Sequence, residues 1–443
     1  MSSSPTENRI TGTPLVAALD GFRAYAIAGV VLIHVLLASG VVARTEGSLA
    51  NTAIWGLLGN VIDAFFIISG FVLFLPVVVR GGDLGGIGRF ARGRAARLLP
   101  GYWLCLVVAL GLVLIVPPFA ALGTPSALEI AANFAALQMP IQLFVADVAI
   151  GFGIDGALWM ISVIVGLYFL LPLIARPYFR HPLLGLALAA AITLGWKQLA
   201  LHSGLFEAIA PEGAVPWAIQ LVALDQLPGW LFSFGLGMTG AWAYVRARER
   251  FSPETLSRRA LQALPVALAS YILFAYLYGK TGDTVSGAVT GSVARSDSVG
   301  ALGSSLSRAA LMGAIILGPL WLQRPFANPF ASRAAELSFG LYLVHVIVIV
   351  YAARYLGLGT DGGVGTLALW LVVVFPVSFL YALASSRLVE RPARDWVRRR
   401  ERRGRPPGRA AARGVFEPRV ADGDVGADPQ SGAADAYQSR SLS

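Results

Sequence analysis

The chain has 443 residues, of which 56% are hydrophobic and only 14% charged, and its net charge is +10. Soluble domains contain about a quarter charged residues, so this composition excludes an ordinary soluble protein and predicts a polytopic membrane protein. It also argues against a nucleic-acid-binding globule, because the basic residues lie in short loops between apolar runs. The single cysteine, Cys105, excludes a disulfide framework and a cysteine-based metal site. Lysine occurs only at Lys197 and Lys280, a bias typical of a GC-rich, bacterial genome.

Ten apolar runs are long enough to cross a hydrocarbon core of about 30 Å, which takes about 20 helical residues. Helices are required because backbone groups in lipid must bond within their own segment. The sequence therefore predicts an all-α fold, a polytopic membrane helical bundle of about ten transmembrane helices. The expected spans are 21–43, 55–79, 100–122, 157–178, 183–201, 228–247, 261–279, 306–323, 336–354 and 364–387.

Arginine is distributed unevenly over the connecting loops. Loops 80–99 and 248–260 contain several arginines, whereas 123–156 and 202–227 contain no lysine or arginine. Because positively charged loops stay in the cytoplasm, both termini are expected to be cytoplasmic. The membrane itself is expected to be the cytoplasmic membrane. Segment 128–150, which polar residues and a proline interrupt, is expected to be a re-entrant or interfacial element on the outer side.

Three regions follow from this pattern. Residues 1–18 lack the order of a signal peptide and are expected to form a cytoplasmic N-terminal segment. Residues 19–396 are expected to form the membrane domain. Residues 397–443 begin with an arginine cluster and continue as a polar stretch. We expect the cluster to lie against anionic headgroups and the remainder to be a disordered cytoplasmic tail.

Two histidines lie inside apolar spans, where ionisable groups are costly and therefore informative. His34 follows Arg23 by eleven residues, which on a helix places it about 16 Å further along nearly the same face. His345 is expected to reach the same depth on another span, and it shares a helix face with Tyr342. Matched depth predicts one shared polar cavity in which His34 accepts a proton from a hydroxyl group. The alternative is two unrelated histidines that serve packing.

The arginines of loop 80–99 suggest an anion site. Arg94 and Arg97 are three residues apart, so both guanidiniums lie on one side of a helical turn at the cytoplasmic interface. That arrangement suits a polyphosphate, because each arginine can bind phosphate oxygens bidentately. Ordinary anchoring of a cytoplasmic loop is the alternative. Asp63 in the second span needs a partner or water, and Ser69 with Gly70 is also compatible with small-residue helix packing.

From about residue 15 to 395 the chain resembles the acyltransferase 3 family of integral-membrane acyltransferases. The likeness rests on six motifs that arrive in the family's order. They are Leu19-Asp20-Gly21-Phe22-Arg23 with His34, Phe65-Phe66-Ile67-Ile68-Ser69-Gly70-Phe71, Arg94-x-x-Arg97-Leu-x-Pro100, Leu158-Trp159 through Ser162, Tyr168 and Pro172, Ser338 through Tyr342 and His345, and Glu390-Arg391-Pro392.

The resemblance implies an O-acyltransferase that moves an acyl group from cytoplasmic acyl-CoA, with acetyl-CoA expected, to a hydroxyl of a carbohydrate or natural-product acceptor. It implies His34 as the catalytic base with Arg23 as its partner, and Arg94 with Arg97 as contacts of the CoA phosphates. Direct transfer and an acyl-histidine intermediate both remain open. No metal and no nucleic acid are implied. Further candidate site residues are Asp20, Asp63, Ser69, Ser162, Tyr168, Tyr342, His345 and Glu390.

The sequence departs from the family at one point. Where the family usually has two glutamates, this chain has Ile164 and Val165. Asp63 and Glu336 are the candidates to replace them. Because of this departure, a catalytically silent family member stays an alternative hypothesis. The buried polar groups are also compatible with a transporter or flippase for a lipid-linked or small metabolite.

Overall fold

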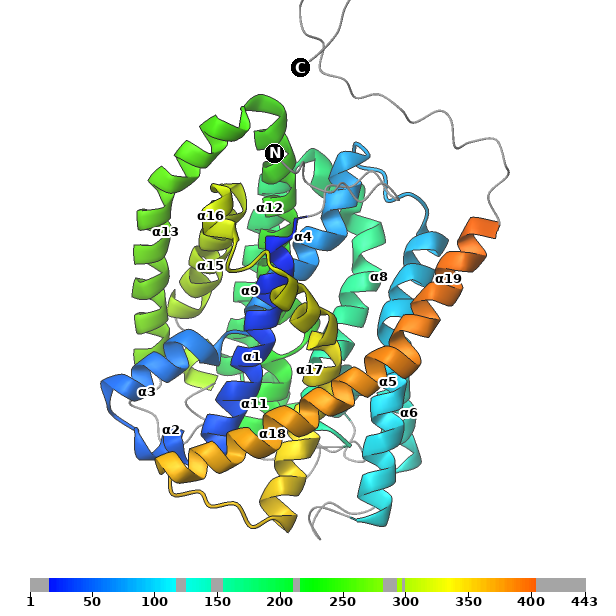
Figure 1. The fold of residues 1–443 in the computed structure, drawn as a ribbon, viewed down its shortest axis with the longest axis vertical. Coiled ribbons are helices and arrows are strands. Elements are labelled where there is room, and N and C mark those ends of the chain that lie inside the picture. Colours follow the sequence, from blue (N-terminus) through cyan, green and yellow to red (C-terminus); the bar gives the residue numbers. More distant parts are fainter. Residues whose placement is uncertain are drawn as a thin grey trace, which may run out of the picture. The chain divides into compact units, whose positions relative to one another are not determined.

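A computed structural model describes residues 16–116, 125–144, 154–209, 216–281, 293–296 and 299–403. Every regular element within these ranges is a helix (Figure 1). The chain divides into two units, Met1–Val397 and Arg398–Ser443, and the fold below is that of the first. The predicted all-α membrane bundle is therefore confirmed. Of the expected terminal segments 1–18 and 397–443, residues 1–15 and 404–443 lie outside the described residues, and residues 397–403 belong to a helix, Arg391–Arg403.

Nine helices of the described part are long and apolar enough to cross a membrane. These candidate spans are Ala18–Ala38, Leu49–Val79, Ile87–Ile115, Gly156–Arg180, Pro182–His202, Pro253–Thr281, Gly300–Leu317, Pro329–Tyr355 and Val364–Arg400. Each overlaps a predicted span. Some helices begin earlier than predicted, as Ile87–Ile115 does against 100–122, and others end earlier, as Gly300–Leu317 does against 306–323.

The long helices form the bundle, and the short helices lie between them in the chain. The long helices are α1 (Ala18–Ala38), α4 (Asp63–Val79), α5 (Ile87–Ile115), α8 (Trp159–Arg180), α9 (Pro182–His202), α12 (Leu231–Arg250), α13 (Pro253–Thr281), α15 (Val299–Leu317), α17 (Pro329–Tyr355), α18 (Val364–Ser385) and α19 (Arg391–Arg403). The short ones are α2 (Val41–Arg44), α3 (Leu49–Ile54), η1 (Trp55–Gly59), α6 (Ala127–Phe134), α7 (Gln138–Gln142), η2 (Gly156–Leu158), α10 (Leu205–Ile209), α11 (Pro216–Leu224), η3 (Leu227–Trp230), α16 (Leu320–Gln323) and η4 (Ser386–Glu390).

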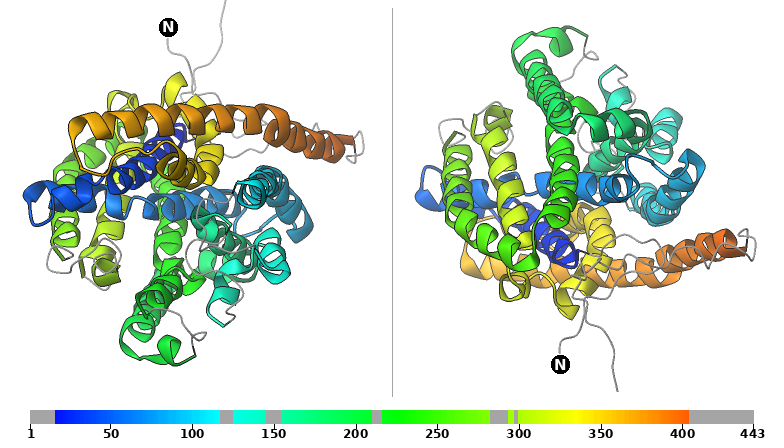
Figure 2. Two further views of the ribbon diagram at one scale, coloured as in Figure 1. Left: turned by 90° about the horizontal axis from the view of Figure 1, so that it is seen from below. Right: turned by 90° about the horizontal axis from the view of Figure 1, so that it is seen from above.

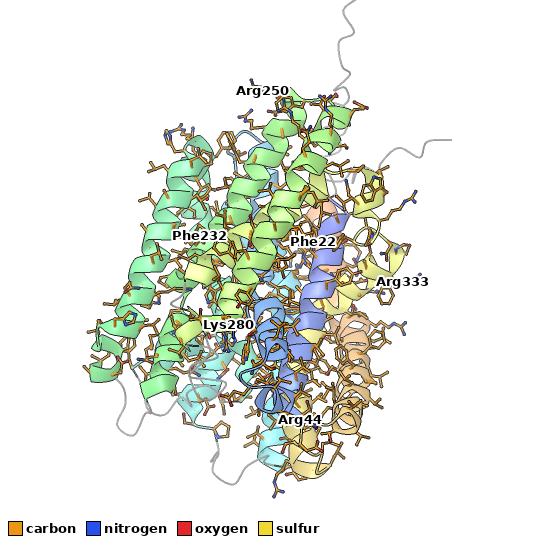
Figure 3. All side chains as sticks on the ribbon, turned by 90° about the vertical axis from the view of Figure 1, so that its left-hand side faces the viewer. Phe22, Arg44, Phe232, Arg250, Lys280 and Arg333 are labelled. Atoms are coloured by element: carbon orange, nitrogen blue, oxygen red, sulfur yellow. The ribbon has the colours of Figure 1, made fainter. Side chains whose placement is uncertain are left out.

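Helix α1 occupies the middle of the bundle. It packs against α4 on one side and α17 on the other, and α17 in turn packs against α18 (Figures 1 and 2). The arginine-rich loops that follow α4 and α12 lie at the same end of the bundle (Figure 1), and Figure 3 shows Arg250 at that end and Arg44 at the opposite end. The cytoplasmic side of the membrane is still a prediction from the loop charges.

The tenth expected span, 228–247, is helical in the structure but is not among the nine apolar ones. Helix α12 contains many glycine and small polar residues and ends in arginines, which lowers its hydropathy. The same small residues allow α4 to approach closely. A Cβ atom at Gly237 would overlap the backbone oxygen of Ile67, and one at Gly70 would overlap that of Phe234. Glycine therefore sets the contact between these two helices.

We expect Gly237→Ala to destabilise the protein by about 1–3 kcal/mol, because the added methyl group must push α12 away from α4. The measurement is the thermal unfolding midpoint of the purified protein in detergent. Gly313→Ala is the matched control, since a Cβ atom at Gly313 in α15 would meet no atom within 4 Å. Equal midpoints for the two variants would contradict the close packing described above.

Segment 128–150 forms two short helices, α6 and α7, and residues 145–153 lie outside the described part. Its polar side chains and backbone bond to the bundle. The hydroxyl of Tyr102 donates to the backbone oxygen of Asn133. Gln138 Nε2 donates to the backbone oxygen of Leu158 at 2.9 Å, and Ser162 Oγ donates to that of Ala136 at 2.6 Å. These polar groups of the segment are therefore hydrogen-bonded to other parts of the protein, and its re-entrant or interfacial position stays a prediction.

Candidate active site

Two histidine rings lie side by side between α1 and α17. The ring centroids of His34 and His345 are 5.0 Å apart, and the rings meet edge to face. His345 is completely buried, whereas His34 retains partial exposure. Tyr342, one helical turn before His345, has its ring centroid 5.8 Å from that histidine. The structure therefore brings these three sequence-predicted residues together.

The hydrogen bonds of the histidines define which ring nitrogen can act as a base. His34 Nδ1 lies 2.8 Å from the Val30 oxygen, and His345 Nδ1 lies 2.7 Å from the Tyr342 oxygen. A carbonyl oxygen only accepts, so each Nδ1 must carry the proton, and Nε2 of a neutral ring then holds the free lone pair. His345 Nε2 is buried without a hydrogen-bond partner among the described residues. Both rings thus present an unprotonated Nε2, which is the form that a general base needs.

Three arginines gather near the start of α1. Arg23 lies within electrostatic range of Arg94 and Arg97, which α5 contributes, and of Tyr168 from α8. Tyr168 also lies within hydrogen-bonding range of Arg94. Asp20 accepts a hydrogen bond from Arg23 across 3.1 Å. The structure therefore joins Arg23 to Arg94, which lies 71 residues later in the sequence, and brings Tyr168 to the same place.

This arginine cluster, which consists of Arg23, Arg94 and Arg97, carries more positive than negative charge. Its acidic neighbours are Asp20 and, in electrostatic range of Arg97, Glu390. Nε of Arg94 is buried and has no hydrogen-bond partner in the described part of the chain. Three guanidiniums against two carboxylates leave a surplus charge and an unused donor, which is the arrangement that binds a phosphate-bearing ligand.

Glu390 and Glu336 form contacts between helices near the end of α18. Glu390 is buried, accepts a hydrogen bond from Ser385 at 2.9 Å, and lies against Gly101 of α5. Glu336 of α17 binds Arg391 through two hydrogen bonds of 2.8 and 2.7 Å. Neither carboxylate forms a hydrogen bond or ion pair with a histidine among the described residues, so Glu336 does not take the place of a missing acid beside His34.

Asp63 is also engaged elsewhere. It forms a buried ion pair with Arg308 of α15 at 2.9 Å and accepts a hydrogen bond from Ser233 of α12. Arg308 also donates to the Asn60 oxygen at 2.8 Å. A cavity of about 40 Å³ lies beside Asp63 and opens among polar residues of α9, α13 and α15. It has room for a few water molecules. Sequence reasoning missed Arg308, which stands at the start of an apolar run.

The remaining sequence candidates have mainly structural contacts. Ser162 and Tyr342 donate their hydroxyl hydrogens to the backbone oxygens of Ala136 and Ala157. Ser69 is partly buried in α4, beside the glycine that contacts α12. Ile164 lies in the apolar core and Val165 packs against it. The two positions where the family has glutamates are therefore part of the hydrophobic packing in this chain.

Asp155 is a buried carboxyl that the sequence analysis did not single out. Its side chain precedes η2 and accepts a hydrogen bond from the Ala157 N–H at 3.0 Å. Burial away from water raises the pKa of Asp155 to about 7, while hydrogen bonds from Ala157 and Cys105 act in the opposite direction. An aspartate three residues before Leu158, in the stretch that leads into the Leu158-Trp159 motif, was the signal in the sequence. No group of three His, Cys, Asp or Glu side chains in the described ranges is arranged to hold a metal ion.

Comparison with known proteins agrees with this geometry. A family model described as an acyltransferase domain, that of the acyltransferase 3 family, matches residues 16–387. No curated protein and no solved structure matches the chain. The matched residues include the histidine pair and the whole arginine cluster.

Proposed function

Because the chain belongs to the acyltransferase 3 family, we propose that this multi-pass membrane acyltransferase moves an acetyl group from acetyl-CoA to a hydroxyl group. The acceptor class that we propose is a carbohydrate or a hydroxyl-bearing natural product, and the proposed location is the cytoplasmic membrane. The observation that carries the proposal is the presence on one helix, α1, of both an arginine-cluster member and one of the paired histidines.

The arginine cluster supports a donor that carries phosphate groups. It lies at the start of α1, at the end of the bundle where the arginine-rich loops gather (Figure 1). The loop charges predict that this end is cytoplasmic, which is where acyl-CoA is available. Arg23, Arg94 and Arg97 together offer a positive surplus to the CoA phosphates, and the free Nε of Arg94 offers a donor.

The histidine pair supports proton transfer at the other end of the site. Eleven residues at 1.5 Å each separate Arg23 from His34 by about 16 Å along α1. The pantetheine arm of a CoA held at the arginines is long enough to bring its thioester toward His34. The acceptor hydroxyl then approaches His34, which is partly exposed, whereas His345 is fully buried.

The proposed reaction needs no reactant other than acetyl-CoA and the acceptor. His34 Nε2 takes the proton of the acceptor hydroxyl while the hydroxyl oxygen forms a bond to the thioester carbonyl carbon. The carbon–sulfur bond breaks, and the CoA thiolate leaves with the electron pair. The imidazolium then returns the proton to the thiolate. The products are an acetyl ester and free CoA thiol.

A donor assay tests the proposal without knowledge of the acceptor. The purified protein in lipid nanodiscs is titrated with acetyl-CoA and with longer acyl-CoAs, and release of free CoA thiol is then followed while candidate sugars and hydroxylated natural products are added. Saturable acetyl-CoA binding and acceptor-dependent thiol release are the expected results. Absence of acyl-CoA binding in folded protein would contradict the proposal and favour a silent member. Solute counterflow without acyl-CoA would favour a transporter.

A further inference from the structure

We infer that Asp155 is a positioning residue for this reaction, which holds the turn of α17 that presents His345 to His34. The inference rests on the proposed function for its role in catalysis, and on the contacts below for its structural part. Asp155 is 8% exposed and immediately precedes η2. Two separate routes of contact lead from its carboxyl group to the residues Tyr342 to His345.

The first route runs through the backbone at the start of η2. Asp155 Oδ1 accepts a hydrogen bond from the Ala157 N–H at 3.0 Å, which fixes the peptide at that position. The Ala157 oxygen accepts the hydroxyl hydrogen of Tyr342, and the Tyr342 oxygen accepts from His345 Nδ1 at 2.7 Å. The carboxyl therefore holds the N–H of Ala157, the carbonyl of the same residue accepts from the Tyr342 hydroxyl, and the Tyr342 carbonyl fixes the tautomer of His345.

The second route runs through Cys105 of α5. Its Sγ lies 3.9 Å from Asp155 Oδ2 and 3.2 Å from the Leu343 oxygen. The thiol has one proton and donates it to one of these two acceptors at a time, so its sulfur packs between the carboxyl and the backbone of the same α17 turn. Cys105 is completely buried, so water does not compete for these contacts.

The surroundings of Asp155 supply no compensating charge. The titratable groups that face it are Tyr102 and Cys105 of α5, Tyr342 of α17 and Tyr381 of α18, and phenols and thiols do not carry a positive charge. No ion pair of the described residues includes Asp155. A buried carboxyl without a cation is costly, because burial disfavours its charged form, and such a carboxyl beside a candidate site is a candidate functional residue.

Substitution of Asp155 tests the catalytic part. Asp155→Ala is expected to lower kcat, measured by CoA thiol release, by about tenfold, because small displacements of reacting groups slow a reaction strongly. The KM for acetyl-CoA is expected to stay unchanged, since the arginine cluster is untouched. Asp155→Asn is expected to retain part of kcat, because its amide oxygen still accepts from Ala157 N–H. Asp361→Ala removes an exposed carboxyl in the loop after α17 and is the control.

Histidine resonances test the structural part without any activity. The chain has only four histidines, so selective labelling of the ring carbon gives four assignable signals. In Asp155→Ala the His345 signal is expected to shift, while the exposed His181 and His202 signals stay in place. If the wild type lacks turnover but His345 still shifts, the proposed function fails and the positioning contact stands. Wild-type kcat in Asp155→Ala, a parallel loss of acetyl-CoA affinity, or an unmoved His345 signal would each overturn the inference.

The pH dependence of stability gives a further check on the burial of this carboxyl. Its pKa of about 7 lies above the usual 3.8, so the folded state binds the proton more tightly than the unfolded state. The contribution of Asp155 to stability is therefore full below pH 4 and is lost as the pH rises toward 7. As the pH rises from 5 to 7, the thermal unfolding midpoint of Asp155→Asn should therefore rise relative to that of the wild type. A pH-independent difference would contradict a buried, uncompensated carboxyl.

Discussion

His34→Ala is expected to lower acetyl transfer by about 10²–10⁴-fold, which is the usual contribution of a general base. The bond between His34 Nδ1 and the Val30 oxygen leaves Nε2 as the basic nitrogen, and alanine removes it. His34→Gln fills similar space without a titratable nitrogen and should lose a similar factor. The measurement is acceptor-dependent release of CoA thiol by the purified variant at saturating acetyl-CoA.

The control for this experiment is a histidine outside the site. His181 is exposed at the junction of α8 and α9, so His181→Ala should retain wild-type turnover. The His34 variants should also keep wild-type affinity for acetyl-CoA, because the arginine cluster lies about 16 Å away along α1. Near-wild-type transfer by His34→Ala would exclude the proposed base and leave His345 as the candidate.

The membrane fold could be predicted because its signals are local. Long apolar runs and the need to satisfy backbone groups in lipid identify each helix from its own residues. Helix α12 marks the limit of that reasoning. Its glycines lower the hydropathy of the segment. Gly237 allows close contact with Ile67 on another helix, and no local sequence pattern predicts that contact. The joining of α6 and α7 to α5 and α8 by buried hydrogen bonds is likewise a tertiary property.

The candidate site could be predicted in part because helix geometry is regular. The spacing of Arg23 and His34 fixes their separation on α1, and the expected matched depth of His34 and His345 anticipates the neighbouring rings. The partners of the buried carboxylates could not be predicted in the same way. Asp63 pairs with Arg308, which is 245 residues away, and Glu336 pairs with Arg391. Asp155 showed no periodic pattern, its place just before the Leu158-Trp159 motif was the one sequence signal, and its burial beside Cys105 becomes visible only in the structure.

The arginine cluster allows the donor half of the reaction to be tested apart from the chemistry. The double variant Arg94→Ala with Arg97→Ala is expected to weaken acetyl-CoA binding by at least about 2 kcal/mol, a factor of about 30, because two charge-assisted phosphate contacts are lost. The measurement is the Kd for acetyl-CoA, by titration of the purified protein in nanodiscs.

The same helix provides a control of equal charge. Arg89 and Arg92 precede the pair on α5 and are exposed, so Arg89→Ala with Arg92→Ala removes the same two positive charges from the same end of the bundle. If general attraction to the charged surface binds CoA, both double variants should lose affinity equally, and the loss should vanish at high salt. If Arg94 and Arg97 contact the phosphates directly, only their removal should cost a factor of about 30. Unchanged affinity in the Arg94 and Arg97 variant would mean that these arginines serve only to anchor the loop.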